Sequence, residues 1–444
     1  MTAGYADEVL VPWGRVTRLR HQVAHPRHRG EAAALVAAAA AKRTPLLGVG
    51  LHRSYGDSGL NPNAKILNCR GLDRFMAFDR QAGLLRAEAG TSLDEILRLI
   101  VPHGWFLPVT PGTLFVTLAG AIANDVHGKN HHRRGSFGRH VRRIGLLRSD
   151  HGQMELSPED HPDLFHATLG GLGLTGLITW AEISLIPIAS STLRQEARSF
   201  GNLAEFFDLN AQSEEAFEHV SAWVDCTASK ANLGRGVLFR ANWAETGPLL
   251  PHRFSSRLSV PIEAPSWLMN PWTLKAANVA IRAREAVRST VETLSYASAL
   301  YPLDAIGHWN RAYGAPGFYQ HQCVIPPDSQ ERAMTEVLQT ISASGQGSFL
   351  SVMKTLGAKA SGGLVSFHGP GTSLALDFPN RGASTLALLE RLDQIVTAAG
   401  GRIYPAKDGR MSAATYRAGY PGWVELERQR DPLFISSFWQ RVTQ

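Results

Sequence analysis

Short apolar runs alternate with amphipathic stretches over the first part of the chain. Residues 45–50, 65–68 and 84–89 are brief runs that contain Leu and lie next to Gly, Pro or Asn, and they predict three β-strands. Apolar residues then recur three and four positions apart, directly after Ser92, and Ser92 with Glu95 has the spacing of a capping box. This pattern predicts an amphipathic helix that begins at Ser92.

The pattern changes after Ser190, where polar helices become longer and tryptophan appears in the apolar runs. Residues 221–225 and 237–241 predict two strands of a second sheet. Residues 386–399 predict a helix, because their apolar positions follow a helical period and the pair Gly400-Gly401 ends them. The chain therefore combines helices and strands, and we expect an α+β fold.

Residues 264–277 fit neither pattern, since they are rich in Pro, Trp and Met and have weak periodicity. A mobile lid or a membrane-touching flap is one interpretation, and an ordinary surface loop is the alternative. The last segment, 402–444, is too short to fold alone and must pack on the rest of the chain. We therefore divide the chain at about residue 190 and again at residue 401.

The composition is that of a globular protein. The 444 residues are 44% hydrophobic and 19% charged, which gives enough chain for two to three domains. The longest apolar run, 32–41, is too short to span a bilayer and predicts a surface helix. The sequence shows no secretory signal, and its cysteines, which are far apart, have no metal-binding spacing, so we expect a cytoplasmic protein.

The net charge of +7 has three interpretations. It can be a solvated basic surface, it can attract an anionic membrane or a phosphorylated substrate, or it can bind nucleic acid. We expect no nucleic-acid binding, because no ribonucleoprotein motif, zinc finger or basic helix is present.

Two segments, 48–58 and 109–138, mix many glycines with polar and titratable side chains. We expect Gly112, Gly120 and Gly128 to permit turns that a side chain would forbid. Successive N–H groups in such loops can hold a pyrophosphate, although a glycine-rich turn between strands is the alternative. A protein core does not need this mixture, whereas a site for a large polar cofactor does.

A Gly-x-Gly-x-x-Gly sequence occurs at residues 171–176, but its surroundings exclude a Rossmann site. A Rossmann fingerprint follows a strand and opens a helix. Here residues 163–168 have a helical pattern, and 178–188 alternate as a strand. We therefore expect no nicotinamide cofactor at this turn.

Histidines cluster at His127, His131, His132 and His140. A metal site needs side chains that converge, but neighbouring residues point apart in a helix or a strand. Only Asp125 could complete a ligand set, so we expect no metal there.

Several motifs in chain order carry a family resemblance that runs nearly end to end. They are Trp13-Gly-Arg15, Arg53-Ser-Tyr-Gly-Asp57, His127-Gly-Lys-Asn-His-His132, Gly173-Leu-Thr-Gly176, Tyr301-Pro-Leu-Asp304, Trp309-Asn-Arg-Ala-Tyr-Gly314, Asp377-Phe-Pro379 and Tyr404-Pro-Ala-Lys-Asp408. The chain resembles the vanillyl-alcohol-oxidase, or PCMH-type, FAD-binding flavoproteins, and within them the decaprenylphosphoryl-β-D-ribose 2′-oxidases. The resemblance implies an FAD-binding domain from residues 1–190, to which the segment 402–444 returns. It also implies a substrate domain, 191–401, built on an antiparallel sheet, with the active site between the two.

The resemblance implies that the glycine-rich segments hold FAD. The residues implied are Gly48, Val49, Gly50, Leu51, His52, Arg53, Ser54, Tyr55, Gly56, Asp57, Ser58, Gly112, Thr117, Leu118, Ala119, Gly120, Asn124, Asp125, Val126, His127, Ile178 and Tyr404. Some relatives bond the flavin covalently through a histidine where this chain has Arg53. We therefore expect non-covalent FAD, although His52 is adjacent.

The resemblance also implies a reaction, the oxidation of the 2′-hydroxyl of a polyprenyl-phosphoryl ribose. His127 and Lys407 are the catalytic candidates, since a histidine can take the hydroxyl proton and a lysine beside the flavin favours its reduced, negative form. Lys129, Gln322, Lys354 and again Lys407 are implied to bind the substrate. A partner reductase would complete epimerisation to the arabinose form, and peripheral contact with a membrane would suit a lipid substrate.

Two other functions stay open from the sequence. One is an aldonolactone or alditol oxidase of the same fold, which would act on a soluble sugar with oxygen. The other is a flavin-fold scaffold without turnover. The intact glycine loops and Lys407 argue against the scaffold, because a protein that binds no cofactor does not need them.

Overall fold

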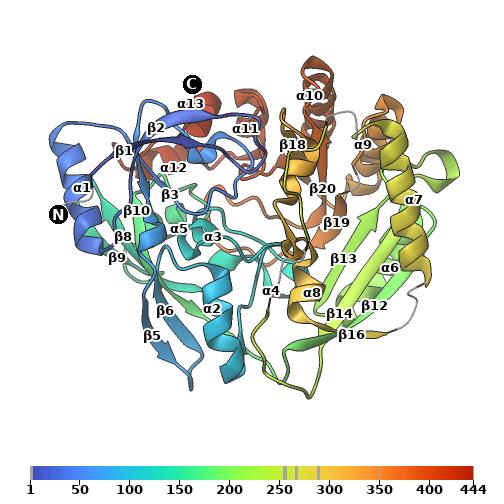
Figure 1. Ribbon diagram of the computed structural model, residues 1–444, viewed down its shortest axis with the longest axis horizontal. Coiled ribbons are helices and arrows are strands. Elements are labelled where there is room, and N and C mark those ends of the chain that lie inside the picture. Colours follow the sequence, from blue (N-terminus) through green and yellow to red (C-terminus); the bar gives the residue numbers. More distant parts are fainter. Residues whose placement is uncertain (1–3, 254–257, 266–268, 288–290, 349, 444) are drawn as a thin grey trace.

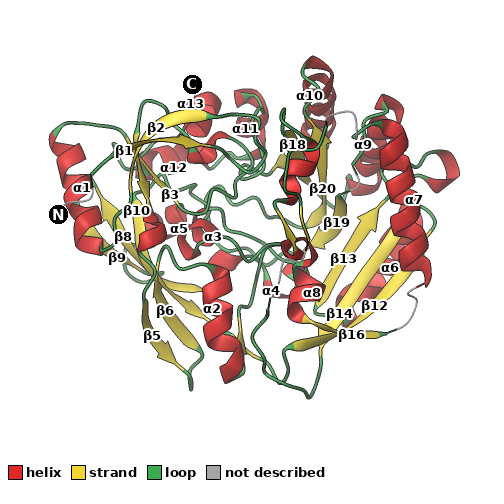
Figure 2. Ribbon diagram, in the orientation of Figure 1, coloured by secondary structure: helices red, strands yellow, loops and turns green. Residues whose placement is uncertain are grey.

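The computed structural model describes residues 4–253, 258–265, 269–287, 291–348 and 350–443. Helices and strands are interleaved in two groups that lie side by side (Figure 1, Figure 2). One group holds the strands up to β10, and the other is built around one large sheet. The α+β class that the sequence predicts is confirmed.

The first group contains a four-stranded sheet and a five-stranded sheet. The four-stranded sheet has the order β1 (Ala6–Leu10), β2 (Leu19–Ala24), β4 (Lys65–Asn68) and β3 (Leu46–Val49), with β4 parallel to both β2 and β3. The antiparallel five-stranded sheet has the order β5 (Phe75–Asp79), β6 (Leu84–Glu88), β10 (Leu177–Ser184), β8 (Val141–Arg148) and β9 (Gly152–Leu156). Its helices are α1 (Arg29–Ala41), α2 (Leu93–Ile100), α3 (Leu118–Ala123), α4 (His131–Arg134) and α5 (Pro162–Thr168).

Two local predictions for this group are confirmed, and a third is corrected. Ser92 and Glu95 form the capping box at the start of α2, whose apolar side buries Leu93, Ile96, Leu97 and Ile100. The segment before Gly171 is helical and the segment after Gly176 is a strand, so the glycine turn does not have Rossmann surroundings. The strand predicted over 178–188 is interrupted, because β10 ends at Ser184 and a separate strand β11 (Ile186–Pro187) pairs with β7 (Trp105–Phe106).

The second group is an eight-stranded antiparallel sheet. Its order is β16 (Glu292–Ser295), β12 (Thr192–Phe200), β14 (Gly236–Trp243), β13 (His219–Val224), β19 (Ser351–Leu356), β20 (Gly371–Pro379), β18 (Phe318–Ile325) and β21 (Arg402–Ile403). The helices beside it are α6 (Leu203–Ala216), α7 (Pro271–Val287), α8 (Tyr296–Leu300), α9 (Gln330–Ser344) and α10 (Ala383–Ala398). A two-residue parallel pair, β15 (Leu258–Ser259) and β17 (Ile306–Gly307), lies apart from this sheet.

The segment predicted as a lid, flap or loop is partly helical. Residues from Pro271 onward belong to α7, whose residues pack against β12 and β14, so this part is not a loop. Residues 266–268 lie outside the described residues. In the described ranges, no helix combines the length and the apolar character that a membrane span needs.

The C-terminal segment contacts both groups. Its first strand, β21, pairs with β18 of the large sheet. Of the helices that follow, α11 (Ala413–Gly419) packs on β21, α10 and α13 (Ser437–Thr443). Helix α12 (Trp423–Gln429) contacts α5, and α13 contacts the 57–59 turn of the first group, red next to blue in Figure 1. Backbone bonds tie them there, since Ser437 N–H donates to Leu60 and Leu46 N–H donates to Leu433. The division at residues 190 and 401 stays a prediction.

Candidate active site

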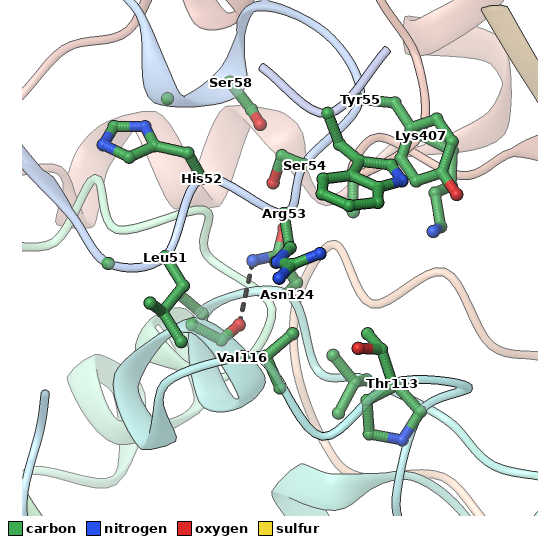
Figure 3. Close-up of a pocket in the computed structure, with 18 of the residues that line it drawn as sticks. Leu51, His52, Arg53, Ser54, Tyr55, Ser58, Thr113, Val116, Asn124 and Lys407 are labelled. Atoms are coloured by element: carbon green, nitrogen blue, oxygen red, sulfur yellow. Dashed lines mark hydrogen bonds between the residues drawn. The ribbon is translucent and has the colours of Figure 1, made fainter. Parts of the chain in front are cut away.

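A long cavity lies between the loops of the first group and strands β18, β19 and β20 of the large sheet. Residues 48–60, 111–127 and 172–178 supply most of one wall, and Gln322, Lys354 and Lys407 belong to the other. In Figure 3 the loop from Leu51 to Ser58 lies opposite the turn of Thr113 and Val116, with Arg53 between them.

Glycines in the 48–58 loop allow close approach of other segments. A Cβ on Gly56 would lie 1.9 Å from the carbonyl oxygen of Asp408, and one on Gly50 would lie 2.4 Å from the Thr117 hydroxyl. Thr117 caps α3 by accepting from the Gly120 N–H at 3.1 Å. The loop, the start of α3 and the C-terminal segment can therefore meet only because side chains are absent.

None of Gly112, Gly120 and Gly128 has a positive φ, so no left-handed turn requires them. Gly128 still excludes a side chain, because its Cβ would lie 2.8 Å from the Thr110 carbonyl oxygen. The cavity-lining residues with a positive φ are instead Gly173 and Gly176, at 74° and 138°, and the non-glycine residues His52 and Leu172, at 50° and 56°. Gly112 and Gly173 have no atom within 4 Å of a built Cβ, so they leave open space beside the cavity.

Most of the predicted cofactor residues line this cavity. They are Gly48, Val49, Gly50, Leu51, His52, Arg53, Ser54, Tyr55, Gly56, Ser58, Gly112, Thr117, Ala119, Gly120, Asn124, Val126, His127, Ile178 and Tyr404. Asp57, Leu118 and Asp125 do not line it. Arg441 pairs with Asp57 at 2.8 Å, Leu118 is in the apolar core, and Asp125 bonds to serines behind the wall.

His127 lies at the meeting point of the two walls. The Gln322 Nε2 group donates to His127 Nε2 at 2.9 Å, so the neutral ring carries its proton on Nδ1. That Nδ1 is buried and has no hydrogen-bond partner among the described residues. Burial and, after it, the charge of Lys354 hold the pKa of His127 well below its ordinary value, and the ring is therefore neutral.

Lys407 follows the 404–406 turn and points at the 48–58 loop. Its Nζ lies 3.9 Å from the centre of the Tyr55 ring, a cation–π contact. Burial lowers the pKa of Lys407 to about 8, against the opposing effect of the Asp377 carboxylate. Lys407 is not a surface partner of Asp408, whose carboxylate instead accepts from Arg441 at 2.9 Å.

The two other predicted substrate lysines differ in position. Lys354, on β19, lines the cavity and donates to the Gly128 carbonyl at 3.3 Å, and burial lowers its pKa to about 7. Lys129 does not line the cavity, because its Nζ donates to the Ala299 carbonyl at 2.8 Å. Burial lowers the pKa of Lys129 to about 8. Two of the three lysines are therefore placed at the site.

Sequence reasoning missed an aromatic and polar rim. The guanidinium of Arg53 lies 4.1 Å from the Trp13 ring centre, and Trp309 packs edge-on against Trp13 at 5.5 Å. Gln320 and Ser373 also line the cavity. Trp13 and Trp309 lie in motifs that carry the family resemblance, which is a signal that could have found them, whereas nothing in the sequence around Gln320 and Ser373 marks these strand positions.

The residues present fit an FAD molecule. The glycine-rich backbone wall at residues 48–58 and 171–176, with open space at Gly173, suits a pyrophosphate and adenosine, which need close backbone approach. His52 Nε2 and His127 Nδ1 are buried at this wall without a partner among the described residues, and a polar ligand can satisfy both.

Comparison with known proteins identifies the family. Residues 21–156 match the family model of an FAD binding domain. The decaprenylphosphoryl-beta-D-ribose oxidase of Mycolicibacterium smegmatis is 36% identical over 409 residues, 88% of each chain. A Streptomyces coelicolor protein described only as an uncharacterized protein in the mprA 5′ region is 32% identical over 79% of this chain and 99% of its own. A putative D-arabinono-1,4-lactone oxidase of Neurospora crassa matches 35% of this chain at 26% identity. The chain therefore belongs to the decaprenylphosphoryl-beta-D-ribose oxidase family and is an FAD-dependent oxidoreductase.

Proposed function

We propose that this protein oxidises the 2′-hydroxyl of a polyprenyl-phosphoryl-β-D-ribose to the 2′-keto sugar. The relative from Mycolicibacterium smegmatis bears the name of a decaprenylphosphoryl-ribose oxidase and is similar over most of both chains. The observation in this structure that carries the proposal is the charge of the cavity. Arg53, Lys354 and Lys407 line it, while Asp304 is its only carboxylate among the described lining residues.

This charge favours an anionic substrate. A cation buried without a counter-ion is costly, and a phosphate offers the missing charge. Burial lowers the pKa of both Lys354 and Lys407, and a bound anion would stabilise their charged forms, although Asp377 already offsets part of this effect at Lys407. A neutral alditol gives no such compensation, so a phosphorylated sugar fits the cavity better.

His127 is the proposed base. FAD, when bound, supplies the acceptor for the two electrons that leave the sugar carbon. His127 is neutral, and its Nε2, which carries no proton, can take the hydroxyl proton once the substrate hydroxyl replaces the Gln322 amide as its hydrogen-bond partner. Before substrate binds, Gln322 orients the ring through this 2.9 Å bond. Lys407, charged below a pH of about 8, provides positive charge at this site and stabilises negative charge that develops there.

The lipid part of the proposed substrate and the keto sugar product each imply a partner, a membrane and a reductase. We propose that a separate short-chain reductase reduces the keto sugar to the arabinose form, and that the protein works in the cytoplasm at the membrane surface. Leu258, Ile262 and Trp272 are 68%, 73% and 81% exposed, and such side chains suit peripheral contact with lipid.

The visible spectrum under anaerobic conditions tests the proposal. We expect a yellow protein whose flavin band bleaches when a polyprenyl-phosphoryl ribose is added and stays unchanged with free alditols. Bleaching only with soluble sugars, and hydrogen peroxide in air, would favour the aldonolactone or alditol oxidase, which the Neurospora relative makes the second candidate. A protein that cannot be loaded with FAD would refute both.

A further inference from the structure

Asp125 is predicted as a cofactor residue, but the structure gives it other partners. It is completely buried beside the cavity wall, and it does not line the cavity. Its carboxylate accepts hydrogen bonds from Gly138 N–H (2.7 Å), Ser136 Oγ (3.0 Å), Ser361 Oγ (2.5 Å) and Ser366 Oγ (2.6 Å), and His368 Nδ1 is 3.5 Å away. Burial raises the pKa of Asp125, but His368 and the serines lower it to about 2, so the group is a carboxylate.

These partners come from both sides of the active site. Ser136 and Gly138 follow α4 in the same part of the chain as Asp125. Ser361, Ser366 and His368, in contrast, belong to the connection between β19 and β20 of the large sheet. A single carboxylate therefore joins the turn that carries His127 to a segment of the opposite wall.

The joined segment touches His127 directly. The ring of His368 lies 5.0 Å from the ring of His127, at an interplanar angle of 74°, and Phe367 lies 5.7 Å from it. Asp125 also has a φ of 40°, a left-handed conformation that costs free energy in a residue other than glycine. Its hydrogen bonds hold this conformation and so set where the chain leads into His127.

We propose that Asp125 is a positioning residue that aligns His127 by locking the Ser361–His368 segment against the flavin-side turn. The inference rests on the proposed role of His127 as the base. It assigns Asp125 no contact with substrate or cofactor. Displacing a reacting group by about 1 Å can lower the rate about 100-fold. A residue that fixes the position of His127 is therefore favourable even though its own backbone conformation is strained.

Variants can separate positioning from general stability. Asp125→Asn keeps the size of the side chain and tolerates a positive φ, but it cannot accept from all of the donors. The double variant Ser361→Ala/Ser366→Ala removes both serine bonds that cross the site, together with the bond between the two hydroxyls and the one from Gly363 N–H to Ser361. Ser136→Ala is the matched control, since it removes a serine bond to the same carboxylate without crossing.

The first measurement is the side-chain ¹⁵N spectrum of His127 in the FAD-loaded protein, assigned by its loss in His127→Gln. We expect one neutral form with the proton on Nδ1 in the wild type and in Ser136→Ala, and a mixture of forms in the other two variants. The second is steady-state kinetics, where kcat should fall about 10- to 100-fold in Asp125→Asn with KM changed less than about 3-fold.

Two results would overturn the inference. One is an unchanged His127 spectrum in the double serine variant, which stays informative even if Asp125→Asn does not fold. The other is a change of the His127 spectrum in Ser136→Ala as large as that in the double serine variant, which would make Asp125 a structural anchor only. If the wild type does not oxidise a polyprenyl-phosphoryl ribose, the proposed function fails, but the spectra still decide the positioning role.

Discussion

The wall from residues 48–58 and 111–127 is rich in glycine, with Gly48, Gly50, Gly56, Gly112 and Gly120 among its lining residues, whereas the wall from β18, β19 and the 404–407 turn meets the cavity with Gln322, Lys354 and Lys407. The first wall depends on side chains being absent, since Cβ atoms on Gly50 and Gly56 would overlap Thr117 and Asp408. The second depends on particular charges and their pKa values. Substitutions should therefore act through steric overlap on the first wall and through altered charge on the second.

The largest effect should come from the charged wall, at Lys407. Lys407→Met removes the cation but keeps a long apolar side chain, and we expect flavin reduction by the substrate to slow about 100- to 1,000-fold with FAD still bound. Single-turnover bleaching measures it. Lys65→Met is the matched control, because Lys65 also lies over a tyrosine ring, 4.3 Å from the centre of Tyr5, but not at the cavity. Equal rates in wild type and Lys407→Met would refute the role.

A glycine on the backbone wall should show the opposite kind of effect. Gly56→Ala places a Cβ against the Asp408 carbonyl, and we expect it to destabilise the fold by about 1–3 kcal/mol and to weaken FAD retention. Thermal unfolding and flavin release measure this. Gly30→Ala, which meets no atom within 4 Å, should leave both unchanged. A Gly56→Ala protein as stable as the wild type would show that the contact is not needed.

The pH dependence of substrate binding sharpens the role of charge. Lys354 has a pKa lowered to about 7, so it is charged below that pH and neutral above it. KM for a phosphorylated substrate should thus rise about tenfold as the pH increases from 6 to 8, through loss of a charge-assisted hydrogen bond. Lys354→Met should have a high KM at both pH values. A KM that falls with increasing pH would contradict this assignment.

The last prediction is that FAD is bound without a covalent bond to the protein. Arg53 lies at the position where some relatives attach the flavin, so acid precipitation should release all FAD into the supernatant. His52, which lines the cavity with its Nε2 unpartnered among the described residues, is the residue to substitute if flavin stays with the precipitate. Retained flavin that His52→Gln releases would show a covalent bond.

The outcome at individual residues shows how far sequence patterns reach. Strand β4 has the predicted bounds, 65–68, and α2 starts at the predicted capping box, because both depend on neighbours a few positions away. The directions of Asp57 and Lys129 were not predictable in this way. Their partners, Arg441 and the Ala299 carbonyl, are far along the chain, and only folding brings them together.

The sequence by itself determined the secondary structure, the glycine-rich loops and the family, since each depends on local periodicity or on motifs in order. Tertiary structure alone decided which polar groups face the cavity and which are buried behind it. Asp125 and His127 are close in sequence and belong to the same turn, yet only His127 lines the cavity. The physical reason is that a buried carboxylate must find its donors wherever the fold supplies them, and two of the donors to Asp125, Ser361 and Ser366, come from a segment more than two hundred residues away.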